Sequence, residues 1–248
     1  VIVAGEGSIA TVGERIAGGD DSLVVSSVEI YAEQGSNVTF LSVQDLPQTA
    51  WHFGISRAVV GRDAAVRSLT ATLGARFSRS LTHSYLDGAG AHAEMLGVYF
   101  GDGDQFVDHR TLQSHRAPNT SSVLKYKGAL KGSSRAVYMG RVDIEKDAPR
   151  SDAQQENRNL LLSPHASALP EPFLEIKTSE VVRATHGVSV GRPDAQVLFY
   201  LQSRGLDRDD AEHLFVKGFF QEVLDRIPVA KVRETLENAV ERELELEG

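Results

Sequence analysis

Short apolar runs, separated by glycines and polar turns, make up most of residues 1–200. Six of these runs occupy residues 22–33, 37–43, 68–74, 122–130, 136–144 and 172–178. In the run 68–74, Leu69, Ala71 and Leu73 alternate with threonines, which places successive side chains on opposite faces of a strand. The helical period of 3.6 residues is almost absent here. Many short strands without helices between them predict an all-β architecture.

A weak internal repeat at the start of the chain bears on which β architecture this is. At a fixed offset of 28, Ile2, Ala4, Gly7, Ser8 and Thr11 match Ile30, Ala32, Gly35, Ser36 and Thr39. Repeated strand–turn units of this size indicate a solenoid, in which rungs stack on a continuous core. The pattern alone leaves a sandwich or a jelly roll equally open.

Residues 145–158 interrupt this pattern, because they are polar and have no apolar spacing. We expect a long loop between rungs here. Loops of this length are uncommon in compact domains and often functional.

The last fifth of the chain changes to helical spacing. Within residues 205–227 the apolar face comprises Ala211, Leu214, Phe215, Gly218, Phe219 and Leu224. Asp207 is the expected N-cap of this helix, and Pro228 separates it from a second amphipathic stretch. The apolar residues of that stretch are Val229, Val232, Leu236 and Val240. We therefore divide the chain into a β core, residues 1–203, and a C-terminal helical domain, residues 204–248.

Composition excludes several classes of function. The net charge of −8 argues against bulk binding to nucleic acid or anionic lipid, since both need a basic surface. The chain has no cysteine, which removes disulfides and thiolate chemistry and mildly favours the cytoplasm. No apolar run approaches the length of a membrane span. The chain begins at Val1, and we interpret it as a fragment whose natural N-terminus is missing.

Candidate catalytic motifs are missing from the sequence. Eight histidines are present, yet none shows the spacing of a zinc motif, and no phosphate-binding loop or nucleophile elbow occurs. In a solenoid His83, His92, His109 and His115 would be able to meet. We favour the simpler interpretation that each ring lies beside a turn and is hydrogen-bonded to backbone groups. No catalytic residue and no tightly bound cofactor are expected.

Residues 157–219 resemble the SufB/SufD family of iron–sulfur cluster assembly proteins. The resemblance is carried by Asn157–Ser163, Pro172–Ile176, His186-Gly187, Gly191, Phe199-Tyr200-Leu201, Ser203-Arg204-Gly205 and Gly218-Phe219, and upstream by residues 83–105 and 115–130. Members of this family have an N-terminal helical region, a right-handed parallel β-helix and a C-terminal helical region. The resemblance therefore implies a mainly β fold, in which the β-helix and a small C-terminal α-helical region are present and the N-terminal helical region is missing.

The resemblance also directs attention to His186. Scaffolds of the SufB type are expected to carry a cluster-assembly cysteine, so a chain without cysteine is more similar to the SufD branch. Where the family often has Cys-Ser-His-Gly, this sequence has Ala184-Thr185-His186-Gly187. A single imidazole gives iron neither affinity nor geometry, so a partner would have to complete the site. The implied role of His186 is a transient iron or cluster ligand at the partner interface; the alternative is a turn-shaping residue.

The partners implied by the resemblance are a SufB paralogue and the ABC-type ATPase SufC. SufB would pair with the edge of the β-helix, and the same edge would allow a homodimer of the isolated chain. SufC would dock on the C-terminal helices, where the candidate anchors are Phe215, Phe219 and Phe220. Phe199, Tyr200 and Arg204 are further candidate partner-binding residues. The expected function is a non-catalytic, cytoplasmic scaffold that binds neither nucleic acid nor membrane. The alternative is a β-helix carbohydrate lyase or hydrolase, which would need a dense acidic cluster.

Overall fold

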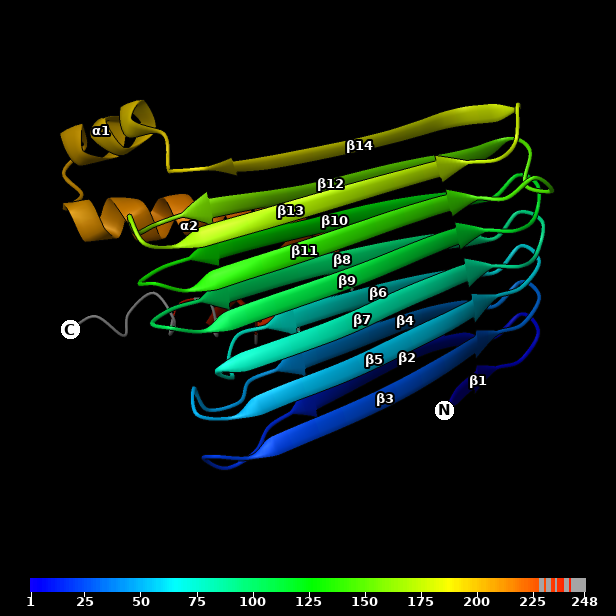
Figure 1. Cartoon of the computed structure of the whole chain (residues 1–248), viewed down its shortest axis with the longest axis horizontal. Helices are drawn as coiled ribbons and strands as arrows, with labels where there is room; N and C mark the ends of the chain where they lie inside the picture. Colours follow the sequence, from blue (N-terminus) through cyan, green and yellow to red (C-terminus); the bar gives the residue numbers. More distant parts are fainter. Residues whose placement is uncertain (228–229, 231–232, 235, 239–240, 242–248) are drawn as a thin grey trace.

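The structure is a computed structural model that describes residues 1–227, 230, 233, 234, 236–238 and 241. Its strands form two seven-stranded sheets in which every pairing is parallel (Figure 1). The odd sheet contains β1 (Ile2–Ala4), β3 (Leu23–Ala32), β5 (Trp51–Val60), β7 (Phe77–Leu86), β9 (Phe106–His115), β11 (Arg135–Ile144) and β13 (Ser167–Ile176). The even sheet contains β2 (Ile9–Ile16), β4 (Asn37–Gln44), β6 (Ala65–Thr72), β8 (His92–Gly101), β10 (Ser121–Leu130), β12 (Ser151–Leu161) and β14 (Val181–Gly191).

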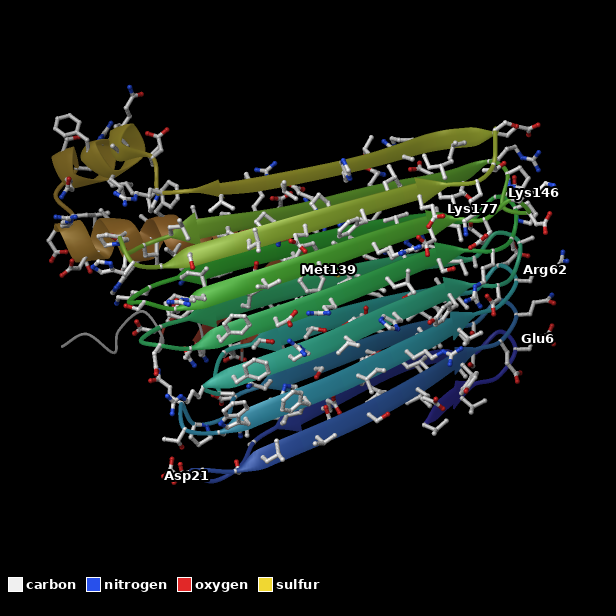
Figure 2. All side chains as sticks on the ribbon, viewed as in Figure 1. Glu6, Asp21, Arg62, Met139, Lys146 and Lys177 are labelled. Atoms are coloured by element: carbon white, nitrogen blue, oxygen red, sulfur yellow. The ribbon has the colours of Figure 1, made fainter. Side chains whose placement is uncertain are left out.

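From β1 to β14 the chain forms a flattened parallel solenoid, and each rung contributes one strand to each sheet (Figure 1). The turns that lead from odd to even strands lie together at one end of the rungs, where Figure 2 labels Glu6, Arg62, Lys146 and Lys177. The helices lie at the other end of the rungs, where β14 ends (Figure 1). The predicted parallel β-helix with a small C-terminal helical region is confirmed.

The 28-residue echo in the sequence is the rung repeat. Ile2 is the register partner of Ile30, and Thr11 is the partner of Thr39. The spacing then changes along the chain: it is 28 for the partners Glu14 and Ser42, 26 for His52 and Ser78, and 31 for Asp152 and Arg183. Because the spacing drifts, a fixed offset reveals only the first rungs.

The loop predicted at residues 145–158 is wrong for its second half. Residues from Ser151 onward form β12, which pairs with β10 on one side and β14 on the other. Its inward side chains include Gln155, Asn157 and Asn159, which are buried although they are polar. The apolar pattern used to find strands fails here because the interior that this strand faces is itself polar.

Two helices follow the last strand: α1 (Ala195–Ser203) and α2 (Arg208–Leu224). The predicted N-cap is confirmed, since the Asp207 carboxylate accepts a hydrogen bond from the Asp210 amide at 2.8 Å. Helix α1 lies N-terminal to the boundary that we drew at residues 203 and 204. Pro228, Val229, Val232 and Val240 lie outside the described residues. Among those described, no helix is long and apolar enough to cross a membrane.

Helix α2 packs on the outer face of the even sheet. Val216, Phe220 and Val223 join one apolar cluster with outward residues of β4, β6 and β8, including Leu41, Leu69 and Leu96. The buried face of α2 is thus shifted from the predicted one, because Leu214 remains 48% exposed. The packing fixes α2 on the outer face of β8 and β10.

Candidate functional site

His186 lies on β14, the terminal strand of the even sheet. Strand β14 pairs with β12 on one side only, and His186 is in register with Gln155. Alternation along the strand places His186 on the same face as Ala184, which packs with Ala153 and Val142 in the interior. The imidazole is nevertheless exposed, because β14 is the last strand of the even sheet among the described residues. The expected position at an open flank therefore agrees with the structure, whereas the metal role stays a prediction.

This chain does not assemble a complete metal site around His186. Among the described residues, no three His, Asp or Glu side chains are grouped to hold a metal ion. Residue 184, where the family often has cysteine, is a half-buried alanine. Iron bound here would need donors from another molecule.

A hollow of about 610 Å³ lies against the same part of β14. It is lined by residues of β10, β12 and β14 and by Arg226, which follows α2. The charges around it are paired: Lys125 Nζ lies 3.3 Å from Glu156, and Arg226 donates to Glu94 at 2.7 Å. Gly187 faces away from His186 by alternation, and a Cβ at this position would meet nothing within 4 Å. The terminal strand thus has open space on its Gly187 face, next to the residue that carries the imidazole.

The last rung also exposes apolar side chains. On β14 these are Val182, Val188 and Val190, and on β13 they are Leu169, Phe173 and Ile176. A strand that pairs on one side only has free backbone donors and acceptors on its other side, which another strand can bind. Contiguous exposed apolar side chains are typical of an interaction surface. The end of the solenoid that carries His186 therefore has the features of a pairing edge.

The candidate residues on the helices divide into two groups. On α1, Phe199 is 72% exposed, and Arg204 stacks on the ring of the exposed Tyr200 at 5.1 Å. On α2, Phe215 and Phe219 are partly buried against the even sheet. Phe220 is fully buried in the apolar cluster. Its prediction as an exposed partner anchor is corrected: it is an internal packing residue, because α2 turns this face toward β8.

The four histidines that a solenoid would allow to come together, His83, His92, His109 and His115, do not form a cluster. His83 contacts Tyr85 on the outer face, His92 Nδ1 lies 2.8 Å from Ser121 Oγ, and His115 bonds to Thr120 and Ser122. The side-chain partners of His92 and His115 are hydroxyl groups. Burial lowers the pKa of His109 and of His115 to about 4, so both rings are neutral at physiological pH.

An ion cluster between α2 and β10 was missed in the sequence. Glu222 accepts hydrogen bonds from Lys125 and from Lys127, the second at 2.6 Å. Lys127 also donates to the Phe219 carbonyl at 2.7 Å and lies 4.7 Å from the Phe219 ring centre. These hydrogen bonds lower the pKa of Glu222 to about 2. The available signal was two lysines spaced by two residues in a strand, which places both on one face.

Comparison with known proteins identifies similar chains. Residues 1–219 match the family described as SUF system FeS cluster assembly, SufBD core domain. An iron–sulfur cluster assembly SufBD family protein of Mycobacterium leprae is 39% identical over 225 residues, which are 88% of this chain and 57% of that protein. The iron–sulfur cluster assembly protein SufD of Bacillus subtilis is 30% identical over 219 residues, which are 87% of this chain and 49% of that protein. The chain spans about half the length of the curated relatives it matches.

Proposed function

Because the chain belongs to the SufBD core family of the SUF iron–sulfur cluster assembly system, we propose that it is a non-catalytic scaffold subunit of the SufD type. It pairs through β14 with a SufB paralogue, and His186 lies at that interface as a ligand for iron or a nascent cluster. Its C-terminal helices dock the SufC ATPase. The family membership favours this function over a β-helix carbohydrate lyase or hydrolase.

The observation that carries the proposal is an exposed histidine on a parallel edge strand that pairs on one side only. A partner strand added to β14 would bury the neighbouring valines and would bring its own side chains next to the imidazole. Neutral imidazole binds iron, and a cysteine thiolate or carboxylate of the partner would supply the remaining ligands. The iron or cluster is then cargo at a shared site rather than a resident cofactor of this chain.

The docking part of the proposal is supported by α1. None of its side chains is buried, and Phe199 and Tyr200 are large and exposed. Aromatic side chains dominate the energetics of many interfaces. We assign the contact with SufC to this aromatic face of α1, with the ATP site on the partner.

The experiment that tests the site replaces His186 with alanine in the reconstituted three-subunit complex. We expect the complex to assemble normally, because an exposed side chain is removed, while cluster formation measured by absorbance and Mössbauer spectroscopy falls at least about tenfold, the scale of losing one metal ligand contact. His165→Ala, an exposed histidine in a turn, is the matched control and should leave cluster formation unchanged. Full cluster formation by His186→Ala would remove the metal role.

The pairing edge is tested separately by charge. Val188→Lys together with Val190→Lys should prevent association with SufB, because charged side chains on an edge strand block strand addition. Ile9→Lys, at the exposed opposite end of the even sheet, is the control. Size-exclusion chromatography with light scattering measures both. Association of the Val188 and Val190 variant at wild-type strength would place the interface elsewhere.

A further inference from the structure

The space enclosed by the two sheets, which we call the lumen, has a polar centre. Inward side chains of both sheets meet there, and they carry hydroxyl, amide and imidazole groups. From the odd sheet these are Ser26, His52, Ser80 and Thr82, and from the even sheet Ser42, Gln44 and Thr70. Apolar clusters lie to the sides, such as the one built on Val38 and Phe40. The interior of this protein is therefore not a uniform apolar core.

A small cavity lies within this polar centre. Its volume is about 30 Å³, and the seven residues just named contribute to its wall. A water molecule needs roughly 10–15 Å³ and two to four polar partners, so the cavity has room for about two waters. Cavities that stay dry are lined by apolar groups alone, whereas here polar side chains share the wall with apolar ones such as Val28 and Phe40.

Two buried polar side chains lie next to the cavity: His109 on β9 and Thr72 on β6. His109 is 1% exposed, and neither of its ring nitrogens has a hydrogen-bond partner among the described residues. The Thr72 hydroxyl is fully buried and equally unpartnered there. His109 is the register partner of Ser80, and Thr72 is the partner of Gln44 and follows Thr70 on β6, so both adjoin residues of the cavity wall. Buried polar groups in folded proteins are nearly always hydrogen-bonded to protein or to ordered water.

The other buried imidazoles show what the fold does when protein groups are within reach. His52 has Ser26 and Ser78 at 3.2 and 3.1 Å, and His115 has two hydroxyl partners at 2.8 Å. His109 instead lies between the rings of Tyr99 and Tyr126, with centroid distances of 5.1 and 5.4 Å. These rings fill space beside His109 without bonding to its nitrogens. The unpartnered nitrogens are thus a local property of this rung rather than of buried histidines in the solenoid.

We propose that the lumen is a binding site for ordered water, centred on His109 and Thr72 and continuous with the cavity beside Ser80 and Gln44. A neutral imidazole has one donor and one acceptor nitrogen, and a hydroxyl has both roles. Water is the ligand that can satisfy all of these groups at once in a space this small. The tyrosines pack over glycines of the neighbouring strands: a Cβ at Gly97 or Gly128 would lie 2.2 or 2.0 Å from a tyrosine ring. These glycines let the rings of Tyr99 and Tyr126 lie close against the neighbouring strands, beside His109.

The first test is a high-resolution crystal structure of the full chain. We expect ordered water within hydrogen-bonding distance of a ring nitrogen of His109 and of the Thr72 hydroxyl. Apolar contacts around both groups, with no solvent density in the lumen, would overturn the proposal.

The second test uses two isosteric variants in solution. Thr72→Val removes a hydroxyl that we assign to water, whereas Thr111→Val removes a buried hydroxyl that bonds to Tyr138 at 3.0 Å. Magnetic relaxation dispersion of the water oxygen counts long-lived internal waters. We expect the amplitude to fall in Thr72→Val and to stay at the wild-type level in Thr111→Val. If the lumen is dry, Thr72→Val will leave the amplitude unchanged and raise the melting temperature, because it removes an unpartnered polar group.

Discussion

Charged and polar residues decide where this fold departs from a simple apolar stack. Lys125 and Lys127 are nearly buried on the outer face of β10, and Glu222 of α2 lies between them. The two hydrogen bonds to this carboxylate hold its folded-state pKa near 2, below the ordinary value of 4.5. The stabilisation is therefore present above pH 4.5 and is lost as the pH falls toward 2.

We expect Glu222→Gln to lower the free energy of unfolding at neutral pH by about 1–2 kcal/mol. The loss of stability is this small because the Glu222 carboxylate is half exposed to solvent. Urea unfolding should also show a smaller loss of stability in the variant than in the wild type between pH 4.5 and 2. Glu175→Gln, which breaks an exposed pair with Arg141, is the control and should change little. An unchanged pH profile in Glu222→Gln would show that the ion cluster does not hold α2.

The buried imidazoles give a signature of the same sign at higher pH. Burial lowers the pKa of His109 and His115 to about 4, so the unfolded chain binds protons that the folded chain does not between pH 6.5 and 4. Stability should fall as the pH is lowered through this window. Nitrogen chemical shifts measured by NMR at about pH 5.5 should show both rings neutral. An imidazolium signal from either residue would contradict the burial described here.

At the scale of helices and strands, the sequence predicted what apolar alternation or a capping residue could mark. The strands in the six apolar runs and the N-cap at Asp207 were found in this way. Strand β12 was missed because its inward residues are amides that bond within a polar lumen, for example Asn157 to Tyr99. Helix α1 was missed because it has no buried side chain and hence no apolar stripe. His186 was singled out only through the family resemblance, since a lone exposed histidine carries no spacing signal.

Helix α2 offers a test of how its two faces differ. Phe220→Ala should cost about 3–5 kcal/mol, because it leaves a cavity in the cluster between α2 and the even sheet. Leu214→Ala, on the exposed face of the same helix, should change stability by about 0.5 kcal/mol or less. Thermal or urea unfolding of both variants checks this. Equal effects would mean that α2 is not seated on the sheet as described.

At the scale of the whole molecule, the solenoid has two unlike ends and two unlike outer faces. Each interior strand pairs with a neighbour on both sides, whereas β14 pairs on one side only. Helix α2 covers part of the even sheet, and the odd sheet presents side chains such as Trp51 and Ile55 to solvent. Stability in such stacks is close to a sum of nearest-neighbour terms, so the ends open first.

Hydrogen exchange should follow this order. Amides of β14 are expected to exchange faster than those of β8 and β10, which have neighbours on both sides. Adding the SufB partner should slow exchange in β14 and leave β8 unchanged. Mass spectrometry of the free chain and of the complex measures both. Equal protection of β14 in the two states would argue against pairing at this edge.

The number of residues per rung varies along the solenoid. Turns absorb most of the difference in residues per rung, and a register shift at the start of β14 takes up one residue of it. Peptide tags or new recognition loops inserted at a turn such as Arg62 would thus extend outward without disturbing the columns of side chains behind them. A single residue inserted inside a strand would instead move the side chains beyond it to the opposite face of the sheet. Insertions should therefore be tolerated better in the turns than in the strands.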